Sequence, residues 1–206
     1  MLKIWGRANS TNVQKVLWCC GELGIGFRRI DAGGGFGVVD TPEYARRNPN
    51  RLVPVIDDDG FVLWESNAIV RYLAAKHGAG TLCPAEPRTR AAADRWMDWQ
   101  ATTVAPPLIF VFKALIRTPP EARDMAALAE AVARMGAAWR IFDRWLAESA
   151  YAAGDAFTMG DIPLGCMAYR WFTMELERPE LASLRAWYDR LTARPAFRQH
   201  VMLPLS

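Results

Sequence analysis

Three short polar segments in the first half of the chain carry side chains that could do chemistry. Ser10-Thr11-Asn12 stands between an apolar run and a helical pattern, Val53-Pro54 opens another apolar run, and Glu65-Ser66 follows a third. A hydroxyl or an amide at the start of a helix can donate a hydrogen bond to an anion, and the positive end of the helix dipole strengthens that attraction. A neighbouring carboxylate attracts an ammonium group.

Each segment also has a purely structural interpretation. A serine before a helix is usually a cap worth ~1 kcal/mol. A proline at the start of a strand usually marks an edge or a turn. Taken singly, the three segments are more simply explained as backbone features, so the case for chemistry depends on their combination.

The elements that would position these segments follow a regular order of short β-like runs and helical patterns. Asp59-Gly60 between two apolar runs predicts a hairpin, so the last two strands should be antiparallel. The pattern reads βαβαββα, a small α/β unit over residues 1–78. In chain order its elements are LKIW, NVQKVLWCCGELG, FRRIDA, TPEYARRN, VPVID, FVLWE and SNAIVRYLAAKHG.

The second half of the chain is predicted to be all-helical. Residues 79–87 are rich in Gly and Pro and form a linker, and residues 88–206 form the helical domain. Pro106 and Pro107 interrupt a helical pattern and should kink the helix near Thr102 and Thr103. One apolar stripe with alternating spacings of three and four predicts a core-facing helix: Met125, Leu128, Val132, Met135, Trp139, Phe142 and Leu146.

A capping pattern begins the next helix. Thr158 and Asp161 have the three-residue spacing of a capping box, with aspartate in place of the usual glutamate. A buried helix should therefore start in the segment FTMGDI.

Composition excludes several function classes. The chain has 206 residues, is 51% hydrophobic and carries a formal charge of only +3, without a block of Lys and Arg, so we expect no nucleic-acid partner. No leader pattern or apolar run near ~18 residues is evident, which predicts a cytoplasmic protein without a membrane partner. The cysteines lack zinc-ligand spacing, so we expect reduced thiols and no metal: Cys19, Cys20, Cys83 and Cys166.

Four motifs together resemble the glutathione transferase family over essentially the whole chain. They are NPNRLVPVI, WESNAIVRYL, the cap FTMGDI and the closing WYDRLTARPAF. The resemblance implies a thioredoxin-like, glutathione-binding domain followed by an all-helical domain. It also implies a two-fold homodimer that uses glutathione as co-substrate and attacks, or reduces, a small electrophile; a peroxidase or reductase side activity would fit.

The resemblance assigns glutathione-binding roles residue by residue. The Val53-Pro54 bond should be cis, so that the Val53 backbone pairs with the cysteinyl backbone of the tripeptide. Glu65 would meet the γ-glutamyl ammonium, and Ser66 the γ-glutamyl carboxylate. The glycine-rich loop AGGGFGVVD has no cation for the glycyl carboxylate, so Arg51 or a second subunit would supply one. Further contacts are assigned to Thr11, Phe36 and Leu52.

The group that faces the glutathione sulfur falls on the first polar turn. In bacterial theta- and nu-like branches this position matches Ser10, and in some relatives the asparagine at Asn12. Lowering a thiol pKa from ~8.5 to ~6.5 needs about 2.7 kcal/mol. One charge-assisted hydrogen bond supplies ~1.5–3 kcal/mol, and the helix end ~0.3–1 kcal/mol more. Either residue is therefore sufficient without a metal or a general base.

The second substrate should bind between the two domains, and its identity cannot be deduced from the sequence. The side chains expected to line that pocket come from the start of the chain and from the kinked helix: Trp5, Arg7, Trp99, Thr103 and Phe110.

Three other functions compete with the transferase hypothesis. A non-catalytic binding or regulatory protein with the same fold is the main alternative. A thiol-disulfide reductase using Cys19 or Cys20 is weaker, because both lie inside the first helix. A phosphate loop in the glycine run is weaker still, because the lysine and Ser/Thr of that motif are missing.

Overall fold

Four short strands form the sheet in a computed structural model that describes all residues, 1–206. The strands are β1 (Leu2–Trp5), β2 (Phe27–Ile30), β3 (Val55–Asp58) and β4 (Phe61–Trp64), in the order β2-β1-β3-β4. β1 is parallel to β2, and the pairs β1·β3 and β3·β4 are antiparallel. Asp59 and Gly60 both have positive φ, 50° and 96°, so the predicted hairpin is confirmed.

The strand register brings the polar segments to one end of this sheet. Trp5 pairs with both Ile30 and Val55, and Val55 pairs with Trp64. The chain that follows β1, β2 and β4 and the chain that precedes β3 therefore all meet at the same edge.

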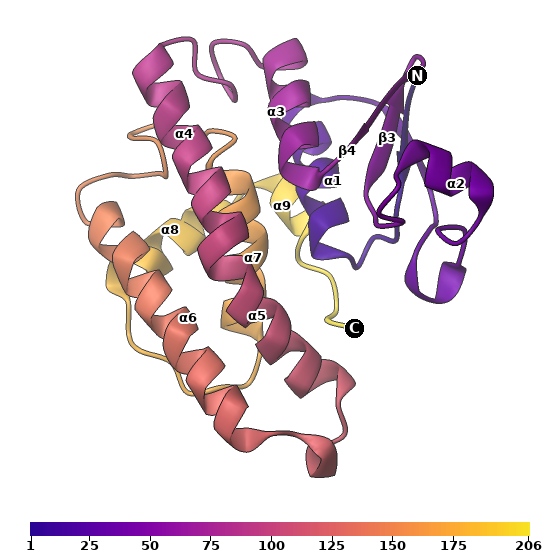
Figure 1. Cartoon of the computed structure of the whole chain (residues 1–206). Helices are drawn as coiled ribbons and strands as arrows, with labels where there is room; N and C mark the ends of the chain where they lie inside the picture. The colour runs from indigo at the N-terminus through magenta and orange to yellow at the C-terminus, as the bar shows by residue number, and fades with distance from the viewer.

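Three helices complete the sheet-containing part, at the right of Figure 1. They are α1 (Thr11–Leu23), α2 (Pro42–Arg47) and α3 (Ser66–His77), and a 3-10 turn, η1, covers Gly34–Phe36. The buried face of α1 packs against α3, and Gly24 ends α1 in the left-handed conformation with φ 64°. The predicted βαβαββα order is confirmed.

The helical part begins at Pro87 and fills the left of Figure 1. One long helical stretch consists of α4 (Pro87–Trp99), the π-helical turn η2 (Gln100–Val104), α5 (Ala105–Phe112) and a second π-helical turn, η3 (Lys113–Arg117). After the 3-10 turn η4 (Pro120–Ala122) come α6 (Met125–Leu146), α7 (Asp161–Thr173), α8 (Ala182–Thr192) and α9 (Pro195–His200).

The first π-helical turn lies where the sequence predicts an irregular helix. Pro106 and Pro107 lack the N–H groups that would bond to the carbonyls of Thr102 and Thr103. At this position the helix forms a wider, π-helical turn over residues 100–104. The Thr102 hydroxyl donates to the Asp98 carbonyl at 3.0 Å, within the same widened region.

The stretch Pro87–Arg117 is long and apolar enough to cross a membrane, by length and composition only. From the sequence we expect no apolar run near the ~18 residues that a membrane span needs. That expectation considers only unbroken apolar runs, and the stretch Pro87–Arg117 corrects it. Core helices of water-soluble proteins meet the same criterion. Here Leu108, Val111 and Phe112 are buried in the main hydrophobic core.

The predicted stripe on α6 is largely confirmed as core. Leu128, Met135, Trp139, Phe142 and Leu146 are buried. Val132 is half-buried, and Met125 is 64% exposed because it is the first residue of the helix, at the end of the bundle. The prediction was wrong for Met125.

The turn before α7 is fixed by Asp161. Its carboxylate accepts from the backbone N–H groups of Thr158 (2.9 Å) and Ala152 (2.8 Å) and from Trp187 Nε1 (2.9 Å). The Thr158 hydroxyl accepts from the Gly160 N–H at 3.3 Å. The segment thus begins a buried helix as predicted, with the Thr158 N–H donating to the aspartate, and burial raises the pKa of Asp161 to about 6.

Contacts between α1 and the helical part hold the two parts together. A Cβ on Gly165 of α7 would lie 2.7 Å from the Trp18 ring, so glycine permits this close packing. Arg194 makes a two-pronged ion pair with Glu22, at 2.6 and 2.8 Å. α1 is therefore held against α7 and α9.

Candidate functional site

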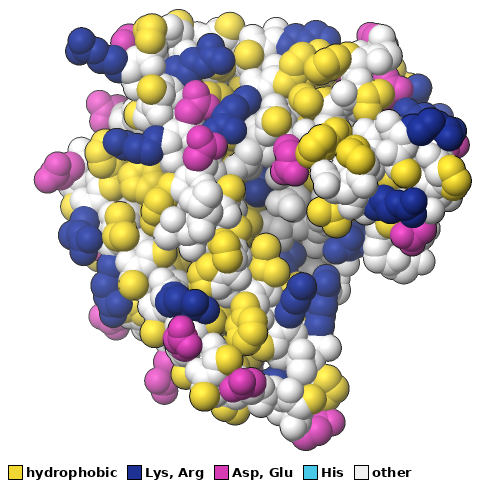
Figure 2. All heavy atoms as spheres, in the orientation of Figure 1, with side chains coloured by type: hydrophobic (Ala, Val, Ile, Leu, Met, Phe, Trp, Pro, Cys, Tyr) yellow, Lys and Arg dark blue, Asp and Glu magenta, His cyan; other side chains and the backbone are white.

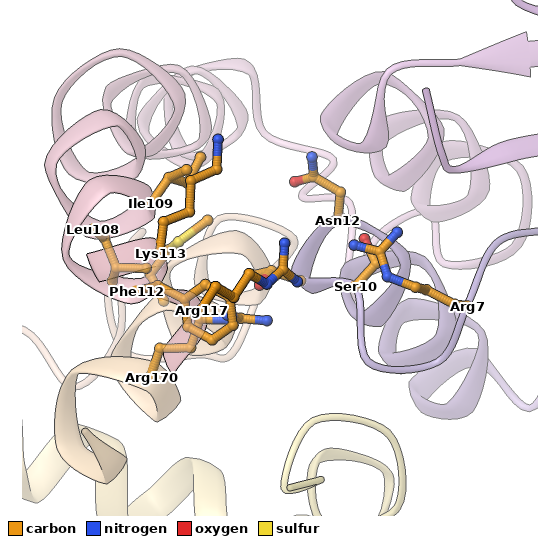
Figure 3. Close-up of a pocket in the computed structure, with 11 residues that line it drawn as sticks. Arg7, Ser10, Asn12, Leu108, Ile109, Phe112, Lys113, Arg117 and Arg170 are labelled. Atoms are coloured by element: carbon orange, nitrogen blue, oxygen red, sulfur yellow. The ribbon is translucent and has the colours of Figure 1, made fainter. Parts of the chain in front are cut away.

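A cavity of about 160 Å³ lies between the first turn of α1 and the helical part. In Figure 2, dark blue Lys and Arg side chains gather along the hollow between the two parts. Figure 3 shows the lining side chains converging from both sides. The lining residues are Arg7, Ser10, Thr11, Asn12, Leu108, Ile109, Phe112, Lys113, Arg117, Met167 and Arg170.

Ser10 immediately precedes α1 and contributes only its backbone to the helix start. Its carbonyl accepts from the Gln14 N–H at 2.8 Å, and its N–H donates to the Arg7 carbonyl at 3.2 Å. The Ser10 side chain makes no capping hydrogen bond. The hydroxyl therefore keeps its hydrogen-bonding capacity for whatever occupies the cavity.

Thr11 and Asn12 line the cavity from the first turn of α1. Asn12 is exposed, whereas Ser10 is 8% exposed. Figure 3 shows both Ser10 and Asn12 beside the opening. Both residues thus stay candidates for the contact with sulfur.

The opposite wall combines apolar and cationic side chains. Leu108, Ile109 and Phe112 come from α5, Lys113 and Arg117 from η3. Leu108 and Phe112 are four positions apart on α5, so one helix face presents both to the cavity.

Arg170 on α7 is the most buried cation of the site, 5% exposed. Its Nη2 donates to the Asn9 carbonyl at 3.2 Å, and its guanidinium lies 3.8 Å from the Phe112 ring centroid. Its Nε has no partner. Burial and the nearby charges of Arg117 and Arg7 lower the pKa of Arg170 to about 10.

Val53 and the glycine-rich loop adjoin the cavity through Arg7. The Val53-Pro54 bond is cis, as the resemblance predicts. A Cβ on Gly33 would lie 3.3 Å from both Val53 Cγ1 and Arg7 Nη1, and Gly33 has φ +76°. Glycine therefore allows the loop to pack against both side chains.

Ser66 begins α3 and is 5% exposed, whereas Glu65, which precedes it, is exposed and has φ 69°. Neither side chain caps the helix. A left-handed conformation is costly for glutamate and is found chiefly where the surroundings impose it.

A buried lysine lies beneath Ser66. Lys15 Nζ is 3.4 Å from Ser66 Oγ, 3.2 Å from Asn67 Oδ1 and 3.1 Å from Gln100 Oε1. Burial lowers the pKa of Lys15 to about 8. Sequence reasoning missed Lys15, although a lysine within the apolar run of α1 could have pointed to it.

The remaining predicted glutathione contacts surround the same end of the sheet. Arg51 Nη1 donates to the Asp40 carbonyl at 3.0 Å. Phe36 and Leu52 are 57% and 64% exposed, although they are apolar. The Leu52 carbonyl accepts from the Tyr44 hydroxyl at 2.8 Å, which fixes the chain just before Val53.

Of the residues expected for the second substrate, only Arg7 lines this cavity. Trp5 is buried in a small core cluster under the sheet. Thr103 and Phe110 lie seven residues apart on another helix face and line a separate hollow against α6. Trp99 packs on Trp96, at 5.0 Å between ring centroids, in a third hollow. Trp99, Thr103 and Phe110 thus belong to the expected helix but lie on faces other than the one that lines the Ser10 cavity.

Both cysteines of α1 are buried in the core. The Cys19 thiol lies 3.9 Å from the Val70 carbonyl, and burial raises the pKa of Cys19 well above its ordinary value and that of Cys20 to about 12. A buried, protonated thiol is a poor nucleophile. This geometry argues against the reductase hypothesis.

Comparison with known proteins identifies the family. Residues 9–76 match the profile described as "Glutathione S-transferase, N-terminal domain", and residues 104–195 match "Glutathione S-transferase, C-terminal domain". The chain belongs to the glutathione S-transferase family. This glutathione transferase is 42% identical in sequence to the Escherichia coli (strain K12) protein "Glutathione S-transferase GstB", and the alignment covers both chains completely.

Other transferases give the same assignment. Glutathione S-transferase 4 of Zea mays is 28% identical, covering 95% of this chain and 89% of its own. A crystal structure of the theta class glutathione S-transferase from Xanthomonas axonopodis pv. citri, with glutathione bound, superposes with a TM-score of 0.96 at 49% identity, covering 100% of this chain and 99% of that one. Nothing in these matches favours the non-catalytic alternative.

Proposed function

We propose that this glutathione transferase binds glutathione along the end of the sheet where the polar segments meet and activates its thiol at the first turn of α1. The observation that carries the proposal is the Ser10 hydroxyl, which lies on a cavity at a helix start and makes no bond to the protein. A polar group at such a position is available to a ligand. The relative solved with glutathione bound, at 49% identity, supports glutathione as that ligand.

The γ-glutamyl group has complementary partners in Glu65 and Ser66. The Glu65 carboxylate is exposed and unpaired in any salt bridge, so it can receive the ammonium. The Ser66 hydroxyl accepts from Lys15, which leaves its own proton free for the carboxylate. Lys15 adds positive charge beneath the same group.

The peptide part of glutathione then follows the sheet. Val53, next to β3, can pair its backbone with the cysteinyl unit, as a further strand would. Thr11, Phe36, Leu52 and Arg51 surround the same end, with Arg51 as the proposed partner of the glycyl carboxylate.

The thiol would be held as a thiolate by Ser10 or Asn12. One hydrogen bond to a charged acceptor contributes ~1.5–3 kcal/mol, and the start of α1 adds ~0.3–1 kcal/mol. Together they reach the ~2.7 kcal/mol that separates a thiol pKa of 8.5 from one of 6.5. The thiolate then attacks, or reduces, a small electrophile held by the opposite wall, and no metal takes part.

The family also supports a two-fold homodimer located in the cytoplasm, without a nucleic-acid or membrane partner. In a symmetric dimer both subunits carry the same site. Light scattering on the purified protein would measure the mass directly, and a single-chain mass would reject this part of the proposal.

Kinetics on two substitutions test the thiol assignment. Ser10→Ala should lower turnover roughly 10- to 100-fold while glutathione affinity changes little, because the ligand's anchors lie elsewhere. If only Asn12→Ala lowers turnover, the role belongs to Asn12. If neither change has an effect, the first turn of α1 is not the thiol site.

A further inference from the structure

The cavity beside Ser10 has an unusual charge. Four of its lining residues are cationic, Arg7, Lys113, Arg117 and Arg170, and none is acidic. None of the four takes part in a side-chain salt bridge within the chain, although Arg117 Nη2 donates to the Ser206 carbonyl at 3.1 Å and Arg170 Nη2 to the Asn9 carbonyl at 3.2 Å. Neighbouring like charges raise the free energy of the folded protein, and a bound anion would relieve that repulsion.

Arg170 supplies an independent sign that this cavity can bind an anion. It is 95% buried, its Nε has no hydrogen-bond partner, and its guanidinium is stacked on Phe112. A buried unpaired donor on a cation costs free energy unless something accepts its bonds. The lowered pKa values of Arg7 and Arg170 have the same origin, burial together with neighbouring positive charge.

Glutathione itself does not account for this charge. Its proposed partners all belong to the sheet-containing part, with Ser66 proposed for the γ-glutamyl carboxylate. Lys113, Arg117 and Arg170 come from η3 and α7, on the other side of Ser10 (Figure 3). That side is where the second substrate must approach the sulfur.

We propose that the second substrate is a small organic electrophile that carries a carboxylate or a similar oxyanion. This inference rests on the proposed function. Arg7, Lys113, Arg117 and Arg170 bind the anionic group, and Leu108, Ile109 and Phe112 contact the carbon skeleton. The cavity, of about 160 Å³, has room for one ring or a short chain.

A matched pair of aryl chlorides tests charge alone. In 4-chloro-3-nitrobenzoate and 4-chloro-3-nitrobenzamide the thiolate forms a C–S bond at the same carbon, and chloride leaves with the bonding electron pair. Each enzymatic rate is divided by the uncatalysed rate with glutathione, which removes the difference in intrinsic reactivity. We expect the benzoate to be favoured about 10-fold in normalised kcat/KM, the value of one charge-assisted contact.

Substitutions then assign the preference to the cations. Lys113→Gln combined with Arg117→Gln changes two exposed side chains and should lower kcat/KM for the benzoate about 10-fold, with the benzamide within twofold. Arg170→Gln should act in the same direction. Arg90→Gln removes one exposed positive charge at the far end of α4 and is the matched control.

Two outcomes would overturn the inference and leave the transferase assignment intact. One is equal normalised rates for benzoate and benzamide in the wild type. The other is an equal fall for both substrates in the variants, which would mean that the cations act on the thiolate. If neither compound reacts with glutathione in the presence of the enzyme, the proposed function fails and this inference with it.

Binding provides a readout without turnover. Calorimetry with the two glutathione conjugates formed from these chlorides should show tighter binding of the carboxylate form. The preference should shrink as salt is raised from about 0.05 to 0.5 M, because screening weakens exposed charges such as Lys113 and Arg117. Equal affinities for the two conjugates would contradict the inference.

Discussion

Among the helices that start at a polar residue, α7 and α1 use that residue in opposite ways. At α7, the Asp161 carboxylate is fully buried and accepts from two backbone N–H groups and from Trp187. At α1, the Ser10 hydroxyl makes no capping bond and lies on the cavity. The first side chain is fully satisfied within the fold, and the second is left available.

A polar residue at the start of a helix can therefore serve either the stability of the fold or the binding of a ligand. A cap lowers the free energy of the folded state by pairing with the helix end. A polar side chain that forgoes that pairing contributes little to folding, so another requirement must explain its presence. α3 is intermediate, because Ser66 does not cap its helix but is contacted by Lys15.

The largest expected effect is on folding. Asp161→Ala should lower the free energy of unfolding by about 3–5 kcal/mol, because three buried donors lose their acceptor. Denaturant titration measures it. Asp161→Asn keeps one acceptor oxygen and should lose less. A loss below about 1 kcal/mol for Asp161→Ala would contradict the conclusion that Asp161 stabilises the start of α7.

The next effect is on binding. Glu65→Gln combined with Ser66→Ala should weaken glutathione by ~2–4 kcal/mol, roughly 30- to 1,000-fold, if the two charge-assisted bonds are partly additive. Calorimetry gives the affinity, and a thermal melt gives the control. The melting temperature should hold, because neither side chain caps α3. If the folded variant binds glutathione with wild-type affinity, Glu65 and Ser66 do not bind the γ-glutamyl group.

A third effect depends on pH and concerns the cation beneath Ser66. The pKa of Lys15 is about 8 in the folded protein against an ordinary 10.5. Between these values the unfolded chain binds the extra proton, so stability rises with pH. Relative to Lys15→Met, the wild type should gain about 2 kcal/mol between about pH 7.5 and 10. A difference that stays flat over that range would mean that Lys15 is not buried as the structure shows.

The fourth prediction concerns the contribution of the Ser10 hydroxyl to stability, which should be small. Ser10→Ala should change the free energy of unfolding by less than ~0.5 kcal/mol, against ~1 kcal/mol for an ordinary serine or threonine cap. Thr41→Ala is the matched control, because the Thr41 hydroxyl accepts from the Tyr44 N–H at 3.2 Å and caps α2. If the two variants lose the same stability, the Ser10 hydroxyl is a cap after all.

Local sequence signals predict the fold of this chain well. Asp59-Gly60 fixes a hairpin, Gly24 ends a helix, and the order of elements along the chain follows from alternating apolar runs and helical patterns. These features depend on a few neighbouring residues, so they are visible before any tertiary contact is known.

The candidate site was only partly predictable for the opposite reason. Ser10, Asn12 and Arg7 lie on one short segment and were identified together. Arg117 and Arg170 reach the same cavity from two distant helices, and no local spacing relates them. Trp99 and Phe110 were assigned to the cavity because the sequence does not specify which helix face turns towards α1.

That choice of face is set by the π-helical turn at residues 100–104. A π turn holds about one residue more than an α turn, and one residue advances the direction of side chains by about 100°. The direction of the α5 side chains Leu108, Ile109 and Phe112 therefore depends on that extra residue, and that of Lys113 and Arg117 also depends on the second π-helical turn, η3. Deleting one residue within 100–104 would leave every cavity-lining residue in the sequence. The α5 side chains would nevertheless turn by about 100°, and a different face of α5 would point towards the sulfur.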